Sequence, residues 1–304
     1  MLLNENGLFG EARQAKALPN IITSLLWVLL FLVVGQGAGG ILAHFTQKII
    51  GKDPAVLLLN GLICGFIFIT LLVFARVKFR EKRSISSIGL KKEGLIKKYL
   101  VGFGIGILMF SIVVLLLSIS GHTVVNSNPR GLSGIAALSG VLIVIPGWII
   151  QSGTEEILSR GWLMNVLGAR YNVAVGLIVS SSIFGLMHFA NPNVNILAII
   201  NIVLLGLFFG MYVIKTNDLW GACGLHAAWN WTQGNVFGFE VSGQKVAAGS
   251  LLNLRLTGSE WFTGGSFGPE AGIAATIILC IGIVILYFSP WHKNLDTVRS
   301  LYNN

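Results

Sequence analysis

Eight mostly apolar stretches, each close to the roughly 20 residues that a helix needs to cross a bilayer, occupy most of this sequence. Backbone groups in lipid must be hydrogen-bonded within the protein, so stretches of this kind fold as helices. We therefore expect an all-α fold, a polytopic integral membrane helix bundle with about eight transmembrane helices. The expected helices are 21–45, 55–75, 99–120, 133–151, 173–190, 195–214, 219–237 and 271–288.

The scarcity of charge supports a membrane protein. Only 11% of the residues are charged and 54% are apolar, whereas soluble proteins carry about 25% charged residues. This balance argues against a disordered chain and against a soluble enzyme of this length. Glycines four residues apart predict places where helices approach closely in lipid. These pairs are Gly61/Gly65, Gly102/Gly106 and Gly206/Gly210.

The net charge of +9 is clustered, and nine of the 21 basic residues lie between Arg76 and Lys98. This segment separates two apolar stretches, so it is expected to be a cytoplasmic loop that contacts anionic membrane lipids. No aromatic-rich recognition motif accompanies the charges, so nucleic acid is not expected as a partner.

If eight spans cross the membrane in alternating directions, most lysines and arginines lie on one side, together with both termini. The predicted organisation is a cytoplasmic N-terminal tail (1–20), a transmembrane bundle (21–290) and a cytoplasmic C-terminal tail (291–304). The expected location is a multi-pass position in a membrane, the plasma membrane if the host is bacterial.

Two acidic residues lie inside an apolar region. Glu155 and Glu156 have apolar residues on both sides, and a charge at the bilayer centre costs about 2.5–3.5 kcal/mol on insertion scales. Glu156 and Arg160 are four residues apart, so they share a helix face and can form an ion pair. Glu155 points elsewhere, and its apolar surroundings suit it to act as a base near neutral pH. Pro146 and Gly147 are expected to bend this helix.

Two further stretches carry unusual polar residues at helical spacing. Phe184 and His188 are four residues apart in one stretch, and His226 and Asn230 are four residues apart in another. A single buried histidine is more often a structural residue. Two histidines in separate helices, together with the intramembrane glutamates, favour a functional site.

These side chains allow two kinds of chemistry. A carboxylate and an imidazole can hold a water molecule and remove its proton, while a second imidazole and an amide stabilise the oxyanion formed at a carbonyl. The result is hydrolysis of a peptide or amide bond without a covalent intermediate. Alternatively, Glu155, His188 and His226 match the ligand types of a catalytic Zn²⁺. The HExxH pattern is absent, so such ligands would come from three helices.

With these residues, the sequence resembles the CPBP or Abi family, which includes type II CAAX prenyl proteases and bacteriocin-processing proteins. Its motifs occur here in order as EExxxR at 155–160, FxxxH at 184–188 and HxxxN at 226–230, within the region 141–237. The resemblance implies an eight-helix intramembrane endopeptidase whose site opens toward the cytosolic side, acting on membrane-associated protein or peptide substrates.

The resemblance also implies a role for each motif residue. Glu155 would be the general base, His188 would help to hold the water, and His226 with Asn230 would form the oxyanion hole. The residues that would shape the site are Glu156, Arg160 and Phe184. This mechanism needs no metal, so no cofactor is favoured and Zn²⁺ remains the alternative.

Two other functions are open at this point. One is a non-catalytic bacteriocin self-immunity or scaffold protein of the same family, in which the motif residues would only stabilise the fold. A proton-coupled transporter is less favoured, because no symmetry between two halves of the sequence is visible.

The expected helix boundaries pose one difficulty. His188 lies 16 residues beyond Asn172, which is about 24 Å along a helix. Glu155 would then lie near the opposite edge of the membrane from His188. We therefore expect the helix that contains Glu155 to continue to Leu167 and the helix before His188 to tilt.

Overall fold

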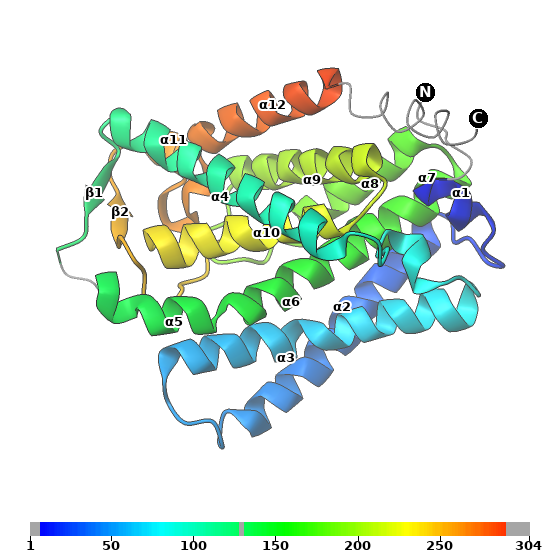
Figure 1. The fold of residues 1–304 in the computed structure, drawn as a ribbon, viewed down its shortest axis with the longest axis horizontal. Helices are drawn as coiled ribbons and strands as arrows, with labels where there is room; N and C mark the ends of the chain where they lie inside the picture. The colour runs from blue at the N-terminus through cyan, green and yellow to red at the C-terminus, as the bar shows by residue number, and fades with distance from the viewer. Residues whose placement is uncertain (1–6, 128–130, 290–304) are drawn as a thin grey trace.

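The computed structural model describes residues 7–127 and 131–289, and within them the chain is a bundle of helices with one two-stranded sheet (Figure 1). The predicted C-terminal tail at 291–304 lies outside the described residues. The α-helices are α1 (Leu8–Arg13), α2 (Ile21–Thr46), α3 (Pro54–Ala75), α4 (Leu95–Ile119), α5 (Leu138–Ile143), α6 (Ile145–Glu156), α7 (Asn165–Arg170), α8 (Val173–Leu186), α9 (Ile196–Thr216), α10 (Trp220–Trp231), α11 (Glu260–Thr263) and α12 (Ile273–Phe288). Segments of π-helix cover Arg76–Arg80, Ile157–Met164 and Thr232–Phe237, and short 3₁₀ turns cover Ile85–Ile88, Gly134–Ala137, Gly265–Phe267 and Pro269–Ala271.

The prediction of an all-α membrane bundle is confirmed, since each of the eight apolar stretches contains a helix. The outer face of α2 exposes large apolar side chains, for example Ile22 and Val33, as expected of a surface that faces lipid. The count of eight spans is not confirmed. Among the described residues, four helices are long and apolar enough to cross a bilayer, or five if a bent pair counts as one span. α8 and α12 are shorter, with 14 and 16 residues.

The helix that carries Glu155 is longer than its apolar stretch. α6, the π-helical segment Ile157–Met164 and α7 form one continuous helix from Ile145 to Arg170, which bends by 48° relative to the helix before it. The expected extension to Leu167 is therefore confirmed, and so is the bend near Pro146. Pro146 occupies the first turn of α6, where a missing N–H leaves no helical hydrogen bond unmade. This continuity places Glu155 in the interior of the bundle.

Two of the three predicted glycine pairs lie at close helix contacts. A Cβ on Gly102 or Gly106 of α4 would meet the backbone of α10, at Gly221 and Leu225. A Cβ on Gly206 or Gly210 of α9 would meet side chains packed against that helix. An added Cβ on Gly61 or Gly65 would itself meet nothing, although the Cα of Gly65 lies at a close crossing of α2 and α3. In that region α2 supplies the small residue, because a Cβ on Gly39 would meet the backbone of α3 at Cys64.

The predicted N-terminal tail is partly folded onto the bundle. Residues Leu8–Arg13 form α1, which packs against α7. Leu8, Phe9 and Ala12 are buried, since apolar residues four apart share one helix face. A Cβ on Gly168 of α7 would meet the ring of Phe9, so the glycine makes room for this contact.

The basic segment between α3 and α4 is also partly folded inward. Glu81 is fully buried and accepts hydrogen bonds from Arg83 Nη2 at 2.7 Å and from Trp162 Nε1 at 2.8 Å. Arg76 lies 3.5 Å from the same carboxylate. Since a buried carboxylate must be paired, this cluster fixes the basic segment to the helix that carries the predicted site. Lys98, at the end of the same segment, pairs with the buried Asp218 at 2.8 Å.

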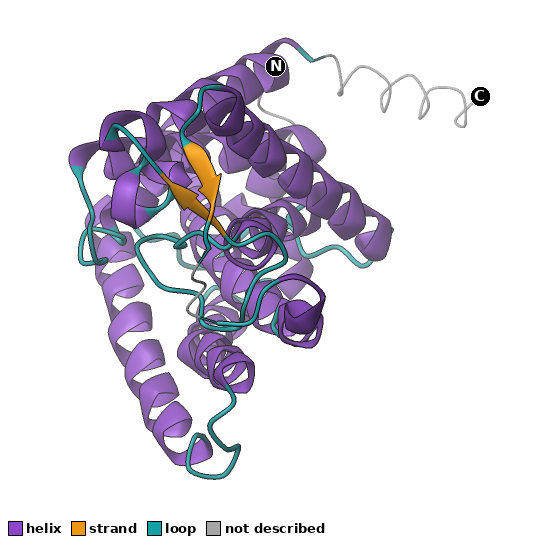
Figure 2. Cartoon of the chain, turned by 90° about the vertical axis from the view of Figure 1, so that its left-hand side faces the viewer, coloured by secondary structure: helices purple, strands orange, loops and turns teal. Residues whose placement is uncertain are grey.

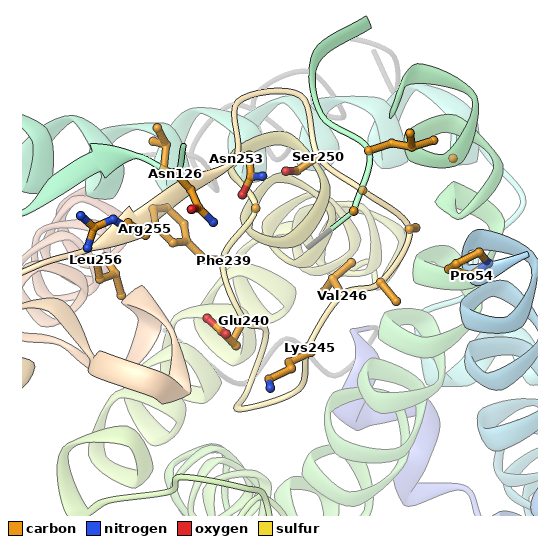
Figure 3. Close-up of a pocket in the computed structure, with 18 of the residues that line it drawn as sticks. Pro54, Asn126, Phe239, Glu240, Lys245, Val246, Ser250, Asn253, Arg255 and Leu256 are labelled. Carbon is orange, nitrogen blue, oxygen red and sulfur yellow. The ribbon is translucent and has the colours of Figure 1, made fainter. Parts of the chain in front are cut away.

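The opposite end of the bundle is built from loops. β1 (Thr123–Val125) pairs antiparallel with β2 (Leu254–Leu256), and Thr123 faces Leu256 (Figure 2). The long segment between α10 and α12 folds beside this pair and encloses a cavity of about 1010 Å³ (Figure 3). No predicted site residue lines this cavity.

Candidate active site

Glu155 and Glu156 are the last two residues of α6, immediately before the helix widens into its π-helical segment. A π-helical turn is rare and often occurs at functional sites, because it changes which side chains face inward. Glu156 and Arg160 are fully buried, whereas Glu155 is partly exposed. The two carboxylates therefore have different surroundings although they are neighbours in sequence.

Glu156 is the centre of a buried charge cluster. Arg160 Nη1 donates to Glu156 Oε1 at 2.9 Å, as the four-residue spacing predicted. The same oxygen lies 2.9 Å from His226 Nδ1, which must carry a proton in order to donate to a carboxylate. The Arg160 guanidinium lies 4.1 Å from the ring centroid of Phe184 and 5.4 Å from that of Phe209. These contacts compensate a buried cation both by charge and by cation–π attraction.

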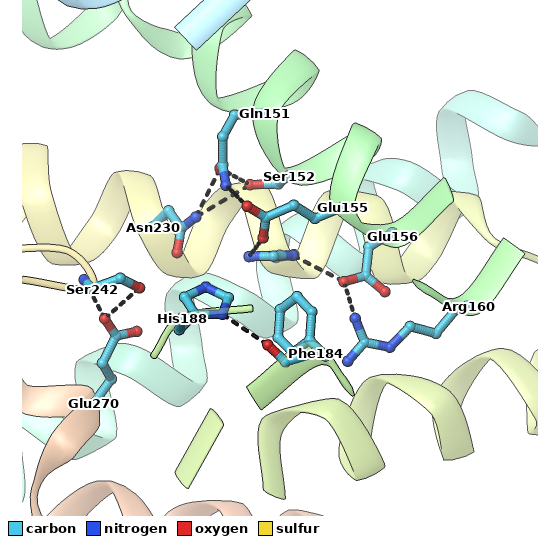
Figure 4. Close-up of polar contacts among 11 residues, drawn as sticks. Gln151, Ser152, Glu155, Glu156, Arg160, Phe184, His188, Asn230, Ser242 and Glu270 are labelled. Carbon is cyan, nitrogen blue, oxygen red and sulfur yellow. Dashed lines mark hydrogen bonds and ion pairs between the residues drawn. The ribbon is translucent and has the colours of Figure 1, made fainter. Parts of the chain in front are cut away.

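Glu155 lies near the other ring nitrogen of His226. Its Oε2 atom lies 3.7 Å from His226 Nε2 and its Oε1 atom accepts a hydrogen bond of 2.7 Å from Gln151 Nε2. His226 therefore bridges the two glutamates, with one ring nitrogen directed at each (Figure 4). A distance of 3.7 Å is too long for a direct hydrogen bond and suits two groups that share a third one.

Asn230 is tied to α6 by residues that the sequence analysis did not select. Its Nδ2 donates to Gln151 Oε1 at 3.0 Å and to Ser152 Oγ at 3.3 Å. Gln151 thus connects the Asn230 amide to the Glu155 carboxylate. Gln151 precedes Glu155 by four residues, so the spacing that paired Glu156 with Arg160 could have identified it.

His188 follows the end of α8 and enters the site from a third element. Its Nδ1 lies 2.8 Å from the carbonyl oxygen of Phe184, which fixes the proton on Nδ1 and leaves Nε2 as an acceptor. Phe184 is buried between the two histidines, with ring centroids 5.1 Å from His188 and 5.9 Å from His226. Figure 4 shows His188 beside Phe184, on the side of the site where Ser242 and Glu270 lie.

The structure therefore brings all seven predicted site residues into one region, from the helix 145–170, α8 with its following turn, and α10. Sequence analysis missed Gln151 and Ser152. It also missed Glu270, a buried carboxylate in the loop before α12. No polar motif surrounds Glu270 in the sequence, so nothing there indicated it.

Among the described residues, no three His, Cys, Asp or Glu side chains are grouped so as to hold a metal ion. His188 Nδ1 is directed at a backbone carbonyl and His226 Nδ1 at Glu156, so each ring keeps Nε2 for another partner. Metal-binding histidines make the same kind of contact through their other ring nitrogen, so the alternative zinc ligands Glu155, His188 and His226 stay a prediction.

Comparison with known proteins gives two similarities. Residues 137–232 match the family described as type II CAAX prenyl endopeptidase Rce1-like. The chain is also 34% identical over 97 residues to YyaK, an uncharacterized protein of Bacillus subtilis (strain 168), and this alignment covers 31% of each chain. The chain thus aligns with about a third of that relative's length. The family match includes every motif residue and ends before Glu270.

Proposed function

We propose that this integral membrane protein, whose residues 137–232 form an Rce1-like domain of the CPBP family, is an intramembrane endopeptidase. Its substrates would be membrane-associated proteins or peptides, as the CAAX-protease-like domain suggests. The observation that carries the proposal is the pair of carboxylates, one at each nitrogen of His226, deep in an apolar bundle. Ionisable residues inside a membrane are rare and usually functional, which favours a catalytic role over that of a scaffold.

Glu155 is proposed as the general base. Glu155 Oε2 and His226 Nε2 face each other at 3.7 Å, and a water molecule held near them could lose a proton to the carboxylate as it attacks a peptide carbonyl. His188 is proposed to help hold this water through its Nε2 atom, since its Nδ1 atom contacts the carbonyl oxygen of Phe184. The proton then moves to the leaving amine, so the bond is hydrolysed without a covalent intermediate.

His226 and Asn230 are proposed to stabilise the oxyanion. Glu156 accepts from Nδ1 of His226, and a doubly protonated ring would also donate from Nε2. The Glu156–Arg160 pair would balance that charge. Gln151 and Ser152 hold the Asn230 amide, and one N–H shared between their two oxygens would leave the second N–H to donate to the oxyanion. Donors fixed in advance stabilise a developing negative charge without reorganisation.

The oxyanion assignment predicts the effect of removing one donor. Asn230→Ala should lower kcat about 10²–10³-fold, the usual result of deleting one oxyanion-hole donor. The measurement is cleavage of a mass-encoded library of lipid-anchored peptides, including prenylated ones, by purified protein in liposomes. Asn60→Ala is the matched control, since Asn60 bonds Thr46 between α2 and α3, away from the site. Equal losses in both variants would reject the assignment.

The metal-free mechanism predicts that chelators do not inhibit. Treatment with EDTA or 1,10-phenanthroline, followed by removal of the chelator, should leave cleavage of the same library unchanged. The reason is that Glu155 and His226 hold and activate the attacking water in this mechanism, so no metal ion is needed. Loss of activity that added Zn²⁺ restores would instead favour ligation by Glu155, His188 and His226.

A further inference from the structure

His188 is the one predicted catalytic side chain that no helix holds. α8 ends at Leu186, and residues 187–190 form turns. The backbone N–H of His188 bonds Gly185 O at 3.1 Å, and the ring bonds Phe184 O. Both partners belong to the last turn of the same short helix. A side chain on a turn is placed less accurately than one on a helix, so His188 needs support from elsewhere.

A chain of hydrogen bonds supplies this support and leads to Glu270. Asn191 N–H donates to His188 O at 3.0 Å, and Asn191 Nδ2 donates to Ser242 O at 3.0 Å. The Ser242 backbone N–H and its hydroxyl both donate to Glu270 Oε1, the hydroxyl at 3.0 Å. Three segments far apart in sequence are thereby connected, and the last group in the chain is a carboxylate.

Packing joins the same three segments. Gly243 has a φ of +78°, and an added Cβ would meet the carbonyl oxygen of Pro192 in the turn after His188. Gly243 N–H also donates to Phe267 O at 2.8 Å, three residues before Glu270. The loop that contains Ser242 is therefore clamped between the His188 turn and the Glu270 segment, and displacement of any one of them would displace the others.

Glu270 is an unusual residue for a merely structural anchor. Its side chain is 4% exposed, and burial raises the pKa of this carboxyl. The two hydrogen bonds from Ser242 oppose that effect and favour the ionised form of the carboxyl. In the view of Figure 4 the His188 ring lies between Glu270 and Glu155. Glu270 thus lies on the His188 side of the site.

We infer that Glu270 is a positioning residue, which holds His188 in its working orientation through Ser242 and Asn191. This inference rests on the proposed endopeptidase function. It adds to the site a residue from outside the segment 137–232 that matches the family. Glu270 does not take part in bond making or breaking; it fixes the turn from which His188 reaches the water.

The inference is tested by kinetics of Glu270→Ala and Glu270→Gln in the liposome assay, expressed per folded protein. Glu270→Ala should lower kcat about tenfold to a hundredfold with little change in KM, because small misplacements of a catalytic group have effects of this size. Glu270→Gln keeps an oxygen that can accept from Ser242, so it should recover part of the loss. Glu260→Gln, an exposed glutamate of the same region, is the matched control and should behave as wild type.

A double-mutant cycle with His188→Gln separates positioning from general damage to the fold. If Glu270 acts through His188, Glu270→Ala should have no further effect on kcat in the His188→Gln background. Additive losses, or a wild-type kcat for Glu270→Ala, would overturn the inference. If Glu270→Ala fails to fold, Ser242→Ala takes its place in the double-mutant cycle, because this variant removes only the hydroxyl donor to Glu270. If wild type and Glu155→Gln cleave equally, the proposed function itself fails, whatever Glu270 does.

Discussion

Glu155→Gln should reduce peptide cleavage about 10²–10⁴-fold, the range that a general base contributes. Glutamine has nearly the same shape as glutamate, and its carbonyl oxygen can still accept the hydrogen bond from Gln151. The substitution therefore removes the ability to take a proton and preserves the packing. Since Glu155 is not part of the Glu156–Arg160 ion pair, the variant should fold as the wild type does.

The control for this prediction is Glu93→Gln, an exposed glutamate in the segment before α4. Both variants are compared with wild type in liposomes, with the initial rate of product formation measured by mass spectrometry. A Glu155→Gln rate close to wild type would mean that another group activates the water. Protection of cells that depends on the protein and persists in Glu155→Gln would favour an immunity function.

Arg160→Met should destabilise the protein by about 3–5 kcal/mol, the cost of leaving a buried charge without its partner. Glu156 and Arg160 are both fully buried and 2.9 Å apart. Removal of the guanidinium would leave the Glu156 carboxylate among apolar side chains with only His226 beside it. The stacking of Arg160 on Phe184 would also be lost.

The double variant Glu156→Gln/Arg160→Met gives this prediction its sharpest test. Replacement of a whole buried ion pair by neutral groups is often tolerated, so most of the stability should return while activity stays low. The measurement is thermal or denaturant unfolding in detergent, with the exposed Arg255→Met as control. If Arg160→Met unfolds as the wild type does, the ion pair does not stabilise the bundle. If the double variant is as active as wild type, Glu156 has no part in orienting His226.

The parts of this structure that follow from local spacing could be predicted. Apolar stretches gave the helices, and the four-residue spacing of Glu156 with Arg160 gave the ion pair. The three motifs identified most side chains in the centre of the site, but not Gln151 and Ser152, which bond Glu155 and Asn230. Residues four apart on a helix are neighbours whatever surrounds them, so such pairs need no knowledge of the fold.

Features that depend on contacts between distant segments could not be predicted. The connection from Glu270 to His188 joins residues more than 80 positions apart, and no periodicity records it. The docking of α1 on α7 depends on a glycine that makes room for Phe9. Hydropathy also cannot locate the ends of helices that contain polar site residues, so the predicted count of eight spans is not confirmed by helix length alone.

The most direct measurement is a single-turnover reaction of the wild type with the lipid-anchored peptide library in H₂¹⁸O, followed by mass spectrometry of products and protein. Direct attack by water activated at Glu155 predicts new carboxyl termini that carry ¹⁸O, together with a protein whose mass stays unchanged at every time point. Absence of cleavage beyond that of Glu155→Gln, or a peptide covalently attached to the protein, would contradict the account.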